Sequence, residues 1–197
     1  MIWCRTGLLL LAAIASATAA EPPAEQPTGE EIGSVQVFLY PDEARMQAFA
    51  QAASFDTIMF AAPIHLQDEL VERGVRSFAD DSVAVYIARD STAAPLGYAI
   101  IGEEIGKYRT ITFLVAVDLQ LQISSVAILV YRESRGGEVR RQRFLRQYRG
   151  KDGADPIRIN RDIINITGAT LSVRALNAGV RKSLLLLESM LDKRPRH

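Results

Sequence analysis

The alternation of apolar and polar positions predicts two short helices, then several β-strands, then one long helix near the C-terminus. In the last segment apolar residues recur every three or four positions, which is the period of an amphipathic helix. The members of this stripe are Val173, Leu176, Val180, Leu184, Leu187 and Leu191. We expect the stripe to face the core and Ser172 to cap the helix N-terminus.

The middle of the chain has the pattern of β-structure. Residues 83–87 alternate, residues 96–101 form a short apolar run, and residues 110–117 and 123–131 are rich in Val, Ile and Thr. The last two segments lie one turn apart, as in an antiparallel hairpin. Together they predict a β-meander.

Upstream of the meander, residues 34–39 predict a short strand, and Pro41 stands where a helix can begin. Helices are expected over residues 43–53 and 65–73, the second ending at Gly74. The buried face of the first helix is expected to consist of Met46, Phe49 and Ala50. This order of elements favours an α+β domain with helices packed on one face of an antiparallel sheet.

The N-terminus resembles a secretory signal peptide. Arg5 precedes a short apolar core at residues 7–15, and Ala17-Thr18-Ala19 offers a cleavage site. We therefore expect a signal peptide at residues 1–20, a linker at 21–33, one domain at 34–192, and a periplasmic or secreted protein. An uncleaved membrane anchor is the alternative.

Composition excludes several classes of protein. The 23 basic and 23 acidic residues balance, which argues against a nucleic-acid partner. Cys4 is the only cysteine and lies in the predicted leader, and His65 and His197 are the only histidines. The sequence therefore predicts no disulfide, no haem attachment and no metal site. No group of catalytic acids and bases is apparent, which favours a carrier over an enzyme.

A short turn carries the clearest candidate chemistry. Thr167-Gly168-Ala169-Thr170 is followed by Leu171 and the predicted helix. The two small residues leave the Thr170 hydroxyl accessible, and the N–H groups at the start of a helix favour a phosphate there. The same four residues could also be a simple tight turn.

This turn resembles the attachment motif of the FMN-binding domain family, in which the last Thr carries FMN through a phosphoester bond. That family includes the C subunit of the sodium-pumping NADH:quinone oxidoreductase and the G subunit of the Rnf complex. Further segments resemble the family's blocks in the same order: residues 40–44, 97–99, 106–107, 131–138 and 144–151.

The resemblance implies a covalent FMN on Thr170, with Thr167, Gly168, Ala169 and Leu171 forming the attachment segment. It further implies a flavin loop, a flavin transferase that uses FAD and a divalent metal, and a redox partner protein or membrane respiratory complex. The loop residues that match are Glu133, Ser134, Gly136 and Gly137. The implied function is secreted or periplasmic electron transfer.

The chain departs from the family pattern at three positions. Tyr131 and Arg135 replace a His and a Pro, and Ile164 stands where an acidic residue is usual. Asp162 lies two residues earlier and would point to the same side of an extended segment, so we expect it to substitute. Ile164 favours the alternative of a non-flavinylated binding or assembly module of the same fold. An accessory subunit of a membrane redox complex and a flavin-dependent reductase remain open.

Basic residues gather between the predicted hairpin and the attachment turn. They could form a solvated face, a docking surface for an acidic redox partner, or support for the flavin phosphate. The group consists of Arg135, Arg140, Arg141, Arg143, Arg146 and Arg149. The sequence does not choose among these roles.

Overall fold

The structure, a computed structural model, describes residues 35–72 and 82–192. The strands are β1 (Gln36–Val37), β2 (Ser54–Ala61), β3 (Ser82–Arg89), β4 (Pro95–Ile105), β5 (Thr110–Val117) and β6 (Ile123–Tyr131). The α-helices are α2 (Pro41–Ala48), α3 (Ile64–Glu72), α4 (Gln142–Leu145) and α5 (Thr170–Asp192). Two 3₁₀ turns are η1 (Gly137–Arg140) and η2 (Arg146–Tyr148). The predicted signal peptide, the whole predicted linker and Gly74 lie outside the described residues.

The strands form one antiparallel sheet in the order β1-β6-β5-β4-β3-β2. The predicted hairpin is confirmed, because β5 and β6 pair with Val115 opposite Val126. Strand β4 extends beyond the predicted Ile101, because its pairing with β5 continues to Ile105 opposite Thr110. The predicted α+β class with an antiparallel sheet is therefore confirmed.

The helix predicted over residues 43–53 is shorter than expected, and the strand that follows it was missed. Helix α2 ends at Ala48, and the chain then turns so that the Ala53 N–H donates to the Arg89 carbonyl at 2.7 Å. This contact begins the pairing of β2 with β3. Pairing with a distant strand overrides the local helix pattern here.

The expected buried face of α2 is largely wrong. The Met46 side chain is 66% exposed and Ala50 is exposed, whereas Ala44 and Phe49 are buried. The shorter helix turns Ala44 toward the sheet, and Phe49 packs from its C-cap position.

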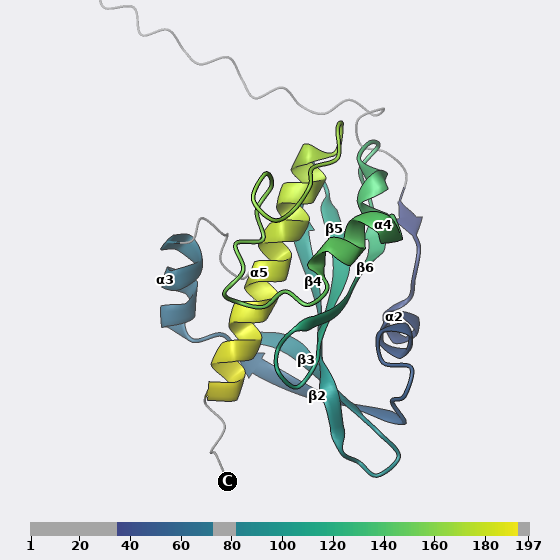
Figure 1. Ribbon diagram of the computed structural model, residues 1–197, viewed down its shortest axis with the longest axis vertical. Coiled ribbons are helices and arrows are strands. Elements are labelled where there is room, and N and C mark those ends of the chain that lie inside the picture. Colours follow the sequence, from purple (N-terminus) through teal and green to yellow (C-terminus); the bar gives the residue numbers. More distant parts are fainter. Residues whose placement is uncertain (1–34, 73–81, 193–197) are drawn as a thin grey trace, which may run out of the picture.

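Helices cover both faces of the sheet, not one face as expected. The long helix α5 lies across one face with α3 beside it, whereas α2 lies on the opposite face (Figure 1). The α5 side is the larger core and includes Phe113, Val115 and Leu176. Small residues such as Ala99 and Ala116 line the α2 side, which allows that short helix to lie close to the strands.

Helix α5 begins at Thr170, two residues before the expected cap Ser172. The predicted apolar stripe is buried except for Leu191, which is half-buried. Leu185 and Leu186 are also buried, since the long segment before the helix wraps around it (Figure 1). No helix in the described part of the chain is long and apolar enough to cross a membrane.

The close contact of α5 with the sheet predicts an effect of adding one methyl group. A Cβ at Gly179 would lie 2.1 Å from the Phe113 ring, and a Cβ at Gly102 of β4 would lie 2.9 Å from the same ring. We expect Gly179→Ala to lower the free energy of unfolding by about 1–3 kcal/mol, measured by urea denaturation. Ser189→Ala in the same helix is the control. Higher stability for Gly179→Ala, as helix propensity alone predicts, would contradict this packing.

Candidate functional site

The Thr167–Thr170 segment forms a tight turn at the N-terminus of α5. Gly168 adopts a φ of 83°, and the Ala169 N–H donates to the Ile166 carbonyl at 3.0 Å. Thr170 is the first residue of the helix and is half-buried. Its Oγ accepts a hydrogen bond of 2.9 Å from Asn165 Nδ2. The candidate acceptor hydroxyl is therefore held at a helix N-terminus.

The loop after β6 is fixed against this helix terminus. The Tyr131 hydroxyl donates to the Arg135 carbonyl at 2.5 Å, and it lies 2.8 Å from Ser172 Oγ. Gly136 has a φ of 88°, and a Cβ there would lie 2.7 Å from both hydroxyl oxygens. Burial raises the pKa of Tyr131, so its phenol stays protonated at neutral pH. Ser172 is thus bound to the loop and is not the helix cap that the sequence predicted.

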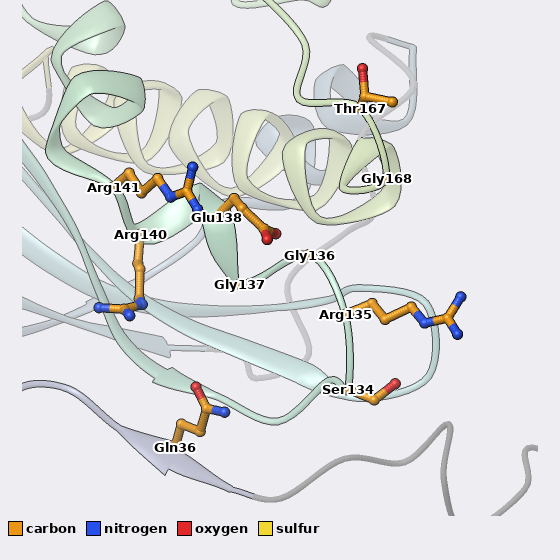
Figure 2. A pocket seen from close by; sticks show the side chains of 10 residues that line it. All are labelled: Gln36, Ser134, Arg135, Gly136, Gly137, Glu138, Arg140, Arg141, Thr167 and Gly168. Carbon is orange, nitrogen blue, oxygen red and sulfur yellow. The ribbon is translucent and has the colours of Figure 1, made fainter.

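A polar cavity of about 460 Å³ lies between the turn and the loop (Figure 2). Thr167 and Gly168 lie on one side of it and Gly136 and Gly137 on the other. The full lining consists of Gln36, Ser134, Arg135, Gly136, Gly137, Glu138, Arg140, Arg141, Thr167 and Gly168. The fold thus brings together five predicted site residues: Ser134, Gly136, Gly137, Thr167 and Gly168.

A second, mainly apolar cavity of about 300 Å³ adjoins the first. Its lining consists of Glu138, Arg141, Arg143, Phe144, Gln147, Ile164, Asn165 and Ile166. Glu138 and Arg141 line both cavities, and Asn165 connects the second cavity to Thr170 through its hydrogen bond. The candidate site therefore combines a polar part and an apolar part beside one hydroxyl group.

Three predicted site residues flank the polar cavity without lining it. Ala169 is buried beneath the turn, with its Cα 3.5 Å from the position of a Cβ at Gly136. Thr170 and Leu171 begin the helix, and the Leu171 side chain is exposed.

Glu133 was predicted to lie beside the cofactor, but it faces the turn between β4 and β5. Its side chain is only 5% exposed, and its Oε1 accepts from the Tyr108 N–H at 2.7 Å and the Arg109 N–H at 2.9 Å. These contacts bind the β4–β5 turn to the end of β6. Through these hydrogen bonds Glu133 stabilises the start of the loop, and it does not line the cavity.

The geometry assumed for Asp162 is wrong. The segment turns back at this point, with an isolated bridge between Ile159 and Ile163, and is not extended. The Asp162 carboxylate accepts from the Ile157 and Arg158 N–H groups at 3.0 and 2.8 Å. It also pairs with Lys151 Nζ at 3.0 Å. Asp162 thus stabilises its own loop.

The arginine group divides by position. All six side chains are exposed to solvent. Arg135, Arg140 and Arg141 line the polar cavity, Arg141 and Arg143 line the apolar one, and Arg146 and Arg149 line neither. Arg140 lies over the Phe38 ring at 4.6 Å. Among the residues that the structure describes, Arg135, Arg141 and Arg143 form no ion pair with an acidic side chain. Their charge is available to an anionic ligand or partner.

Sequence reasoning missed Asn165, Glu138 and Gln147 as site residues. Asn165 is adjacent to Ile164, the position where an acidic residue is usual in the family, and this was the available signal. Glu138 and Gln147 carry no comparable signal. Within residues 35–72 and 82–192 no group of three His, Cys, Asp or Glu side chains could hold a metal ion.

Comparison with known protein families matches one segment of the chain. Residues 106–185 match the sequence profile of the FMN-binding domain family, which confirms for this segment the family that the motifs predicted. Both the flavin-loop candidates and Thr170 lie within it. A comparison with curated proteins gave no match.

A comparison with solved structures found NqrC of Shewanella oneidensis. The two chains share 14% sequence identity and superpose with a TM-score of 0.45, over 80% of this chain and 85% of that one. This similarity is too low to transfer site residues by correspondence.

The contacts of Asp162 predict a pH-dependent contribution to stability. Burial raises the pKa of Asp162, but the Arg158 N–H and Lys151 together lower it below its ordinary value of 3.8. The carboxylate therefore stabilises the folded state above the unfolded pKa, and this contribution is lost as pH falls through the folded pKa.

We expect Asp162→Asn to lower the free energy of unfolding by about 1–3 kcal/mol at pH 7. The difference from the parent should shrink as the pH falls below about 4. Thermal unfolding across a pH series measures it, with the exposed helical residue changed in Asp68→Asn as control. A difference that stays constant with pH would show that the charge of Asp162 does not contribute.

Proposed function

We propose that this protein is an electron carrier whose FMN is esterified to Thr170. The observation that carries the proposal is the meeting of two family segments at one cavity, beside the N-terminus of α5. The Thr167–Gly168 turn and the Gly136–Gly137 loop are about 30 positions apart in the sequence and line the same cavity. Both lie in the segment that matches the FMN-binding domain family.

The surroundings of Thr170 suit a phosphoester. Asn165 Nδ2 donates to Thr170 Oγ, and an ester oxygen can still accept that hydrogen bond. The first N–H groups of α5 and the helix dipole favour the phosphate charge, the dipole by about 1 kcal/mol or less. The cationic side chains of Arg135 and Arg141 line the adjoining polar cavity and have no acidic partners among the described residues.

The two cavities also suit the isoalloxazine ring, which has an apolar benzenoid end and a polar pyrimidine end. Phe144, Ile164 and Ile166 provide an apolar wall, and the glycine loop provides polar backbone groups. Asn165 Oδ1 is buried without a hydrogen-bond partner in the described part of the chain, and it can accept from a ribityl hydroxyl. FMN, when bound, supplies the reversible electron transfer, while the protein orients the ring and sets its surroundings.

The implied partners follow from this chemistry. A flavin transferase using FAD and a divalent metal would load Thr170, and a redox partner protein or membrane respiratory complex would exchange electrons. The signal-like residues 1–20 support a periplasmic or secreted location, where covalent attachment prevents loss of FMN.

Ile164 supports a second candidate, a binding or assembly module that keeps the fold without FMN. Its side chain is 77% exposed and cannot supply a carboxylate. The loading experiment below also decides between these two functions.

Thr170→Ala should abolish flavin attachment, because it removes the acceptor oxygen. It should preserve the fold, because the Thr170 side chain is only half-buried. The parent and the variant are incubated with FAD, magnesium and a flavin transferase. Fluorescence on a denaturing gel and intact mass then report the adduct. Thr57→Ala is the matched control, since this exposed threonine of β2 lines neither cavity, and it should remain labelled.

An adduct on Thr170→Ala would place the flavin elsewhere. A parent chain that remains unlabelled would favour the non-flavinylated module.

The exposed arginines outside the polar cavity should contribute to partner docking. Replacing Arg146 and Arg149, which line neither cavity, with Gln should leave flavin content intact and slow reduction by an acidic donor about three- to tenfold at low salt. The loss should shrink as added salt screens the charges. Stopped-flow reduction over a salt series measures this, with Arg161→Gln as control. Equal rates for parent and variant at low salt would exclude a docking role.

A further inference from the structure

Among the residues that the structure describes, the side chain that hydrogen-bonds to the Thr170 hydroxyl is that of Asn165. Asn165 Nδ2 donates to Thr170 Oγ at 2.9 Å. The two residues are five positions apart and belong to different parts of the backbone, because Asn165 precedes the turn and Thr170 begins α5. The hydrogen bond therefore fixes the acceptor side chain relative to the segment before the turn.

The backbone that carries Asn165 is itself fixed on both sides. The Ile164 N–H donates to Gln147 Oε1 at 2.7 Å, which ties this segment to η2. The Ile166 carbonyl accepts from the Ala169 N–H at 3.0 Å, which closes the turn. Asn165 thus stands between two anchored neighbours and is half-buried. Its amide has little freedom to leave Thr170.

We infer that Asn165 is the positioning residue for flavin attachment, a role that rests on the proposed function. In that reaction Thr170 Oγ forms a bond to the FMN phosphorus of FAD. The pyrophosphate bond to the AMP half breaks, AMP leaves, and the Thr170 proton passes to a base of the transferase or to water. The atoms balance with FAD as the only co-substrate.

The amide of Asn165 is not a base, so its contribution is orientation. Its N–H occupies one lone pair of Thr170 Oγ and holds the side chain in one rotamer. The other lone pair and the O–H remain available to the incoming phosphorus and to the base. Holding a nucleophile in a reactive orientation lowers the entropic part of the barrier.

Neither of the other two candidates contacts Thr170 in this way. The Asp162 carboxylate is engaged by two backbone N–H groups and Lys151. The Ile164 side chain is apolar and exposed to solvent. Of Asp162, Ile164 and Asn165, therefore, Asn165 is the residue that hydrogen-bonds to Thr170.

The test measures loading of the full chain by a flavin transferase with FAD and magnesium. Asn165→Ala should lower the maximal loading rate about three- to tenfold, the effect of one lost hydrogen bond. The carrier concentration at half-maximal rate should change little, because orientation and not recognition is lost. Arg161→Gln, an exposed change in the same segment, is the matched control. Asn165→Ser, whose side chain is too short to span the gap, serves if Asn165→Ala does not fold.

Thermal unfolding of each variant separates positioning from a structural role. A slower maximal rate with an unchanged unfolding midpoint supports the inference. Loading of the Asn165 variants at the parent rate overturns it and leaves the proposed function standing. A fall in rate that only follows a fall in midpoint also overturns it, since the side chain would then be structural. A parent chain that is never loaded overturns the proposed function and this inference together.

Discussion

The bond between the Tyr131 hydroxyl and the Arg135 carbonyl is the contact on which the site depends. This hydrogen bond folds the loop after β6 back toward the end of that strand. Ser172, in the first turn of α5, forms a hydrogen bond with the same Tyr131 hydroxyl. No Cβ fits at Gly136 between these groups. A glycine with positive φ, a buried phenol and a helical serine thus fix the distance between loop and turn. The polar cavity is the space that this arrangement leaves open.

The position of α5 makes this arrangement possible. Gly179 lets the helix approach Phe113 closely, and an ion pair between Lys182 and the largely buried Glu104 joins it to β4. These contacts lie two to three turns beyond Thr170, so packing against the sheet places the helix N-terminus beside the loop. The segment after η2 closes the site from outside, and Asp162 and Lys151 stabilise that segment.

Sequence reasoning succeeded where a local pattern and its three-dimensional environment agree. Strands β5 and β6 and the buried stripe of α5 were predicted because their periodicity is set by one packed face. Strand β2 was missed because its pairing with β3 is a long-range contact. Ser172 was read as a cap because its actual partner, Tyr131, is 41 positions away. The roles of Asp162 and Asn165 depend on how one irregular loop folds, and no periodicity describes such a loop.

The six arginines are clustered in the sequence but occupy different positions in the structure. The sequence presents them as one basic group, but the turn formed by η1 and α4 distributes them around two cavities and the outer surface. Arg141 is exposed but lines both cavities, so its guanidinium is placed to contact a bound anion directly. Arg146 and Arg149 project into solvent, where their field can act only on an approaching partner. The proposed function therefore assigns cofactor electrostatics and partner docking to different members of one charge cluster.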